Sequence, residues 1–186
     1  MKKIPTIFER DWNGDRSRVV DTTNPECTWV FAGEGVATQK IDGTCCLIRS
    51  GKLYKRRELR SGDLEPADWE LADRDLETGK SVGWVPVGNG PEDRYHREAL
   101  EYCGALPDGT YELIGPKVQG NPERTDCNLL VLHGNGIAGP INDVPRTFDG
   151  LREWLSDKNI EGVVWHHPDG RMAKIKLRDF GHKRKS

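Results

Sequence analysis

Residues 37 to 46 read Ala37-Thr38-Gln39-Lys40-Ile41-Asp42-Gly43-Thr44-Cys45-Cys46. Short runs of strand-forming residues lie on either side of Asp42-Gly43, and an Asp-Gly pair between such runs indicates a turn. We therefore predict strands over residues 36–41 and 45–49. A lysine followed two residues later by Asp-Gly is a weak functional signal by itself, because a surface lysine on a strand that runs into a turn gives the same pattern.

Turn residues are frequent along the rest of the chain, with 21 Gly and 11 Pro, and most apolar runs between them are short. This pattern predicts an α+β fold dominated by antiparallel sheet. Ser50-Gly51 predicts a tight hairpin between strands 45–49 and 52–57. Further strands are predicted over residues 29–31, 109–114, 129–133, 162–166 and 172–176. Helices are predicted over residues 91–103 and 148–158, the second capped by Thr147 or Asp149.

Length and composition indicate a globular protein. A chain of 186 residues, 35% hydrophobic and 31% charged, predicts one domain over residues 1–186 with a short basic tail at 177–186. No apolar run reaches the roughly 20 residues that cross a bilayer, so we expect no membrane and a cytoplasmic location. The five cysteines have no zinc-type or redox-type spacing, which predicts reduced thiols.

Charge is unevenly distributed, although the formal net charge is only −2. Residues 61–80 contain seven carboxylates against Arg74 and Lys80, so this stretch should not face phosphate. From Lys174 onward, six Lys or Arg accompany a single Asp179. Contacts with a polyanion are therefore predicted near this end of the chain and around residues 52–60.

Four further motifs follow Lys40-Ile41-Asp42-Gly43-Thr44 in a fixed order. They are Lys55-Arg56-Arg57, Tyr111-Glu112-Leu113-Ile114-Gly115, Glu161-Gly162-Val163-Val164-Trp165 and Lys174-Ile175-Lys176. Together the five motifs resemble the covalent nucleotidyltransferase superfamily of DNA ligases, RNA ligases and capping enzymes. Residues 37–46, 111–117 and 174–181 are most similar to small ATP-dependent RNA ligases, a group that includes a vertebrate RNA ligase. The resemblance implies an antiparallel-sheet nucleotidyltransferase (adenylation) domain of the ligase and capping-enzyme type.

The resemblance implies a three-step reaction with Lys40 as the covalent nucleophile. Lys40 would take AMP from ATP as a lysyl-adenylate, AMP would pass to an RNA 5′-phosphate, and an RNA 3′-hydroxyl would displace AMP, as in RNA repair. Mg²⁺ or Mn²⁺ would assist. A lysine amine attacks only when deprotonated, and its ordinary pKa is about 10.4, so desolvation or nearby positive charge must lower that pKa. Lys174, Lys176 and the metal are the expected sources of that charge.

The resemblance also assigns the nucleotide-binding residues. Gln39 would contact adenine, and Asp42 and Gly43 complete the first motif. Arg56 would hold the ribose or the acceptor 5′-phosphate; Arg57 is the alternative, because neighbouring strand residues cannot both face the site. We favour Arg56.

The remaining site residues are two carboxylates and two lysines. Glu112 and Glu161 would take ribose hydroxyls or the metal ion. Lys174 and Lys176 would share one strand face and reach the α-phosphate. Only ten residues follow Lys176, too few for the β-barrel domain of DNA ligases and capping enzymes, so Lys117, Arg124 and the basic tail are candidates for orienting pyrophosphate.

Two other readings stay open: another nucleotidyltransferase, acting on DNA or using GTP, and a catalytically silent nucleic-acid-binding module. No stable protein partner is evident from the sequence.

Several local signals have plainer interpretations. The glycines of residues 134–139 are expected in a loop, Cys45-Cys46 as half-buried strand residues, His166-His167 as solvated or RNA-facing, and Trp84 and Trp165 as core.

Overall fold

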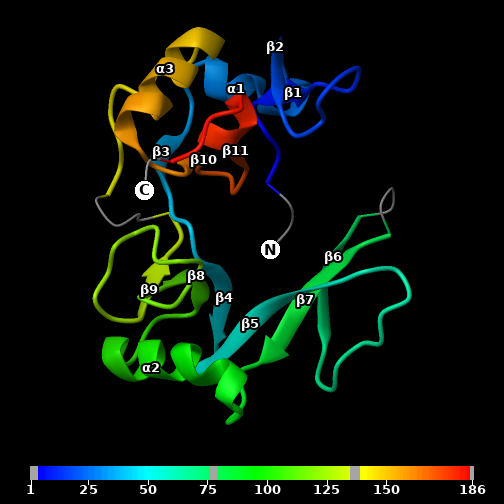
Figure 1. The fold of residues 1–186 in the computed structure, drawn as a ribbon, viewed down its shortest axis with the longest axis vertical. Coiled ribbons are helices and arrows are strands. Elements are labelled where there is room, and N and C mark those ends of the chain that lie inside the picture. The colour runs from blue at the N-terminus through cyan, green and yellow to red at the C-terminus, as the bar shows by residue number, and fades with distance from the viewer. Residues whose placement is uncertain (1–3, 76–78, 135–138, 185–186) are drawn as a thin grey trace. The chain divides into compact units, whose positions relative to one another are not determined.

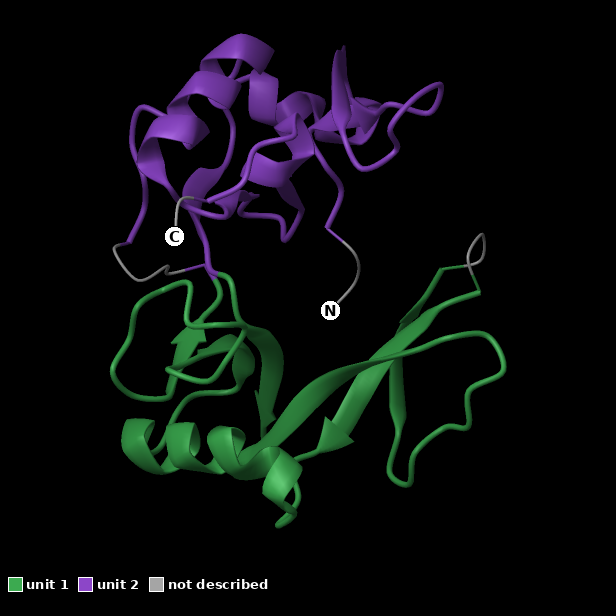
Figure 2. Cartoon of the chain, viewed as in Figure 1, with its two compact units in different colours: residues 1–3, 42–133 green, residues 4–41, 134–186 purple. Residues whose placement is uncertain are grey.

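The computed structural model describes residues 4–75, 79–134 and 139–184. Its contacts divide the chain into two compact units, coloured separately in Figure 2. Unit 1 contains Asp42–His133, and unit 2 contains Ile4–Ile41 and Gly134–Ser186. The chain therefore leaves unit 2 between Ile41 and Asp42, inside the first motif. A single domain over residues 1–186 stays a prediction, because a partition of contacts does not test whether the units unfold separately.

Unit 1 is built on an antiparallel sheet that has six strands within the described residues, in the order β6-β7-β5-β4-β8-β9 (Figure 1). The strands are β4 (Thr44–Arg49), β5 (Lys52–Leu59), β6 (Glu70–Arg74), β7 (Ser81–Pro86), β8 (Gly109–Ile114) and β9 (Leu129–Leu132). Ser50 and Gly51 both have positive φ, the backbone twist that a two-residue hairpin requires, and they join β4 to β5 as predicted.

One face of this sheet is covered by the helix α2 (Arg94–Cys103), which follows the short 3₁₀ turn η2 (Pro91–Asp93). Cys46, Ile48, Leu53, Tyr111, Leu113 and Leu130 form the core with Ala99 of α2. Lys55 joins the same face through a buried ion pair with Asp93. The residues in between, among them Cys45 and Glu112, consequently face away from α2.

Unit 2 is built on the antiparallel sheet β11-β10-β3. Its elements are β1 (Phe8–Arg10), β2 (Val19–Thr23), η1 (Pro25–Cys27), α1 (Thr28–Phe31), β3 (Val36–Lys40), α3 (Phe148–Lys158), β10 (Gly162–His166), β11 (Met172–Lys176) and η3 (Leu177–Phe180). The predicted cap of α3 is Thr147, whose hydroxyl accepts from the Gly150 N–H at 3.3 Å. Trp165, Val163 and Ile175 are fully buried against α3 residues such as Leu151 and Leu155. Trp165 is thus core, as predicted, and so is Trp84 in unit 1.

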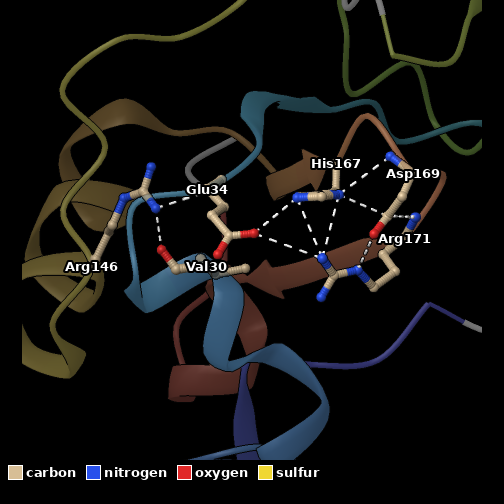
Figure 3. Close-up of polar contacts among 6 residues, drawn as sticks. All are labelled: Val30, Glu34, Arg146, His167, Asp169 and Arg171. Carbon is tan, nitrogen blue, oxygen red and sulfur yellow. Dashed lines mark hydrogen bonds and ion pairs between the residues drawn. The ribbon is translucent and has the colours of Figure 1, made fainter.

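A polar network fixes the turn between β10 and β11 (Figure 3). His167 Nε2 lies 2.9 Å from Glu34 Oε2, and its Nδ1 lies 2.7 Å from Asp169 Oδ1. Arg171 pairs with Asp169 and places its guanidinium over the Trp29 ring. His167 is therefore half-buried among charged side chains and not fully solvated, and the RNA-facing alternative stays a prediction.

The strand predicted over residues 29–31 is wrong, because Thr28–Phe31 forms the helix α1. Asn24 accepts from the Glu26 N–H at 3.0 Å, and Pro25 presets a helical φ, so the chain enters a helical path before residue 29. Trp29 and Val30 are then buried in the unit 2 core. An apolar run this short does not distinguish strand from helix by its pattern. The strands β1, β2, β6 and β7 were not in the predicted set.

The loop predicted at 134–139 includes residues 135–138, which lie outside the described residues. In the part of the chain that is described, no helix combines the length and apolar character needed to cross a membrane. The observed combination of helices with antiparallel sheets is compatible with the predicted α+β class.

Candidate active site

The register of the unit 2 sheet brings three motif lysines to one face. Lys40 on β3 and Lys176 on β11 both pair with Gly162, from opposite sides of β10. Lys174 pairs with Val164, two residues along. Alternation therefore places Lys40, Lys174 and Lys176 on the face opposite the core, to which Ala173 and Ile175 contribute.

Glu161, directly before β10, joins two of these lysines. Its Oε2 lies 2.7 Å from Lys40 Nζ and its Oε1 lies 2.7 Å from Lys176 Nζ. Burial by itself would raise the pKa of this carboxyl, but the Lys40 and Lys176 ammonium groups outweigh burial and hold the pKa below its ordinary value. Glu161 is consequently an ionised bridge between the two lysines. Its predicted contacts with ribose or a metal ion stay predictions.

The pKa of Lys174 is lowered from that of an ordinary lysine. Burial, with a smaller contribution from the positive charges of Lys176 and Lys40, lowers the pKa of its ammonium to about 8. An amine of this kind exchanges its proton close to physiological pH. The sequence predicts the same two causes, desolvation and neighbouring positive charge, for the nucleophile Lys40, and there they stay a prediction.

Gly162 allows the strands carrying these lysines to approach each other. A Cβ added at this position would overlap the Ile175 carbonyl oxygen and the Lys176 Cα, both backbone atoms. Beyond β11, Asp179 accepts the Lys176 backbone N–H at 2.9 Å and forms an ion pair with Arg10. The backbone on both sides of Lys176 is therefore held in place.

Gln39 precedes Lys40 on β3 but pairs with Val163, whose side chain is in the core. Alternation directs the Gln39 side chain to the face opposite that of Lys40. The structure thus does not bring this side chain together with the three lysines, and its contact with adenine stays a prediction.

Unit 1 holds the second half of the first motif. The Gly43 N–H donates to Glu112 Oε1 at 3.2 Å, and the Asp42 N–H donates to Glu123 Oε1 at 3.1 Å. Glu112 is largely buried on β8. The first and third motifs therefore meet through a carboxylate that accepts a backbone N–H.

The register of β5 separates the two candidate arginines. Lys55 pairs with Cys46, which lies on the face covered by α2, so Arg57 is directed to that same face. Arg56 is directed to the other face, with Glu112. Its Nε is buried and has no hydrogen-bond partner among the described residues. A buried guanidinium N–H without a partner suits an incoming anion, which favours Arg56 over Arg57 as the phosphate or ribose contact.

His133 is a site residue that the sequence did not predict. Its Nε2 lies 2.9 Å from Glu112 Oε2, and its Nδ1 lies 3.0 Å from Thr110 Oγ1. No local spacing signals this contact, because it depends on the pairing of β8 with β9. The predicted residues thus form two groups: Lys40, Glu161, Lys174 and Lys176 in unit 2, and Asp42, Gly43, Arg56 and Glu112 in unit 1.

Comparison with known proteins gives a consistent set of relatives, although no protein-family model matches the chain. RNA ligase 1 of Mus musculus is 25% identical over 265 residues, covering 97% of this chain and 80% of that protein. RNA ligase 1 of Danio rerio is 24% identical, and the match covers 98% of this chain and 81% of that protein. RNA ligase 1 of Rattus norvegicus is 26% identical, and the match covers 97% of this chain and 81% of that protein. These aligned stretches exceed 186 residues, so the relatives carry additional residues within them. The chain is therefore related to the RNA ligase family that these proteins represent, and the relationship is consistent with the covalent nucleotidyltransferase superfamily.

Proposed function

We propose that this chain is an ATP-dependent RNA ligase that uses Lys40 as its nucleophile. The observation that carries the proposal is the set of three lysines around Glu161, with the Lys40 amine held by the carboxylate at 2.7 Å. The relatives named RNA ligase 1 support RNA as the substrate class. We propose the nucleotidyltransferase type of adenylation fold for the two sheets.

In the first step, Lys40 Nζ attacks the α-phosphorus of ATP. A nitrogen–phosphorus bond forms, the bond from the α-phosphorus to the bridging oxygen breaks, and pyrophosphate leaves with that oxygen. The ammonium must lose its proton before attack. Glu161 acts as a positioning residue for the amine, and Lys174 and Lys176 stabilise negative charge on the α-phosphate from the same face of the sheet.

In the second and third steps, AMP passes to the RNA 5′-phosphate, and the RNA 3′-hydroxyl then displaces AMP to join the ends. Arg56, with its buried unpartnered Nε, would hold the 5′-phosphate or the ribose. Oxygen ligands suit Mg²⁺ and Mn²⁺, and Glu112 of unit 1 and Glu161 of unit 2 are each proposed as a carboxylate ligand for such an ion. The ion, when bound, neutralises phosphate charge. We place this activity in RNA repair in the cytoplasm, where the five cysteines, none of which forms a disulfide among the described residues, would stay reduced.

The test is retention of label from α-labelled ATP on the denatured protein in the presence of Mg²⁺. We expect label on the wild type, none on Lys40→Ala, and full labelling of Lys52→Ala, which removes an exposed strand lysine. Label on Lys40→Ala would remove Lys40 as the nucleophile. Labelling by GTP in preference to ATP would replace the ligase assignment by another nucleotidyltransferase. Binding of RNA without any labelled protein, with either metal, would favour a silent binding module.

A further inference from the structure

Three side chains in unit 1 bring a thiol, a carboxylate and an imidazole together. Cys45 Sγ, a Glu112 carboxylate oxygen and a His133 ring nitrogen all lie within 4.8 Å of one another. Cys45 and His133 are half-buried, and Glu112 is 9% exposed. The cluster is thus partly shielded from bulk water and partly accessible to it.

The sheet register creates this cluster. Cys45 on β4 pairs directly with Glu112 on β8. His133 directly follows β9, and its backbone N–H donates to the Thr110 carbonyl at 3.0 Å. Thr110 is two residues before Glu112, so His133 lies on the same face as Glu112 and Cys45, opposite α2. Three neighbouring strands therefore contribute one ligand atom each.

The partners of the imidazole and the carboxylate leave suitable atoms directed into the cluster. His133 Nδ1 lies 3.0 Å from Thr110 Oγ1, which can accept an N–H and so leave Nε2 as the metal-binding nitrogen. Glu112 uses Oε1 to accept the Gly43 N–H, while Oε2 faces His133 Nε2 at 2.9 Å. Such outer hydrogen bonds orient imidazole and carboxylate ligands in metal sites.

From this arrangement we infer that Cys45, Glu112 and His133 form a binding site for a thiophilic divalent cation of the zinc class. Thiolate, imidazole and carboxylate are the zinc ligand set, whereas Mg²⁺ takes oxygen ligands and does not use a thiol. Bonds of about 2.0–2.3 Å to zinc in a tetrahedron imply ligand separations of roughly 3.3–3.8 Å. Small side-chain rotations bring atoms within 4.8 Å of one another to such separations.

A cation bound here would link β4, β8 and the end of β9. Because binding to the folded state alone stabilises it, zinc should raise the temperature of thermal unfolding. The inference goes beyond the proposed ligase activity, and its tests measure metal binding and stability. Failure of ATP labelling and failure of metal binding are therefore separate results.

Titration of the reduced, metal-free protein with Co²⁺ tests the site directly. We expect one equivalent to bind with a sulfur-to-cobalt charge-transfer band that excess Zn²⁺ abolishes. Cys45→Ser should lose this band and His133→Gln should bind at least tenfold more weakly. Cys127→Ser, which removes a thiol of unit 1 outside the cluster, should behave as the wild type. A wild type without the band, or Cys45→Ser with an unchanged band, would overturn the inference.

Thermal unfolding gives a second readout that does not depend on the spectrum of cobalt. Zn²⁺ at a concentration just sufficient to saturate the wild type should raise the unfolding midpoint of the wild type and of Cys127→Ser by several degrees, and should shift Cys45→Ser and His133→Gln much less. Circular dichroism of the metal-free variants establishes whether each is folded. If Cys45→Ser does not fold, His133→Gln alone decides the question, and an equal zinc shift in that variant and the wild type would reject the site.

Discussion

At the scale of single residues, the three lysines around Glu161 are the feature with the clearest energetic consequence. A lysine whose pKa is held near 8 by burial carries its charge at neutral pH at a cost in folding free energy. A group of this kind is typical of a site that binds an anion, because a phosphate would offset the cost. The buried ammonium of Lys174 therefore lowers the free energy of unfolding, and a bound phosphate would offset that loss.

Replacing Lys174 by Met should stabilise the protein at pH 7 by about 1–3 kcal/mol, because a buried ammonium is removed. In the wild type, the unfolded chain keeps the Lys174 proton between pH 8 and 10.5 while the folded chain has released it, so stability rises with pH across this window. The advantage of Lys174→Met should therefore fade as the pH approaches 10.5. Urea unfolding at several pH values measures this.

Lys52→Met, at an exposed position of β5, is the matched control and should change stability little at either pH. A Lys174→Met variant that is less stable than the wild type at pH 7 would contradict the lowered pKa of Lys174.

At the scale of elements, strand alternation decides which motif side chains can act together. Lys55 is directed to the α2 face, where it pairs with Asp93, and this fixes the opposite direction for Arg56. The sequence left Arg56 and Arg57 as alternatives. Neighbouring side chains on a strand point to opposite faces of the sheet, but the sequence does not say which of the two faces the site. Pairing of β5 with β4 supplies that information.

Arg56→Ala should reduce joining of RNA ends by at least tenfold while leaving lysyl-adenylate detectable, because the proposed contact of Arg56 is to the acceptor phosphate or the ribose and not to the attacking amine. Arg57→Ala is the matched control, one residue along the same strand, and should retain joining. Gel assays of sealed product and of labelled protein measure the two steps. Equal joining by Arg56→Ala and the wild type would exclude Arg56 from the site.

Gly162→Ala should destabilise the protein by about 1–3 kcal/mol, because its methyl group would overlap backbone atoms of β11 that cannot move away cheaply. The same change should reduce ATP labelling, since Lys40 and Lys176 both pair with Gly162. Gly88→Ala is the control, because its Cβ would meet only Asp93 at an ordinary 3.5 Å. Equal denaturation midpoints for the two variants would show that β10 and β11 do not require a glycine here.

At the scale of the whole molecule, the described residues form two hydrophobic cores, one in each unit. Within the described residues, unit 1 is continuous in sequence, whereas unit 2 combines segments from before and after it. The chain crosses from unit 2 to unit 1 inside the first motif. Lys40 ends the unit 2 strand β3, and the Gly43 N–H donates to Glu112 in unit 1. Residues of the first motif therefore belong to both units.

Leu113→Ala should cost about 2–5 kcal/mol, because Leu113 is buried in the unit 1 core. If contacts within a unit dominate its stability, hydrogen exchange should accelerate more in β4 and β8 than in β10 and β11. Leu64→Ala, at a position that is 92% exposed, is the control and should change neither unit. Equal acceleration in both units would instead support the single cooperative domain that chain length predicts.

The sequence determined most of the elements and the identity of the chemical groups. The Ser50-Gly51 hairpin, the Thr147 cap and the strands that carry Lys40, Glu112 and Lys174 were all predictable, because turn, cap and strand signals are local. The short run at 29–31 was not, since Asn24, Pro25 and the core of unit 2 together select a helix there.

Tertiary structure alone decided which of these groups meet. Pairing of β3, β10 and β11 brings Glu161 to Lys40 and Lys176, and pairing of β4, β8 and β9 gathers Cys45, Glu112 and His133. Residues far apart in the chain meet through strand register, which is set by burial of one sheet face and not by local spacing. The sequence therefore specified the motifs and the lysine that we propose as the nucleophile, and the register of two sheets specified their partners.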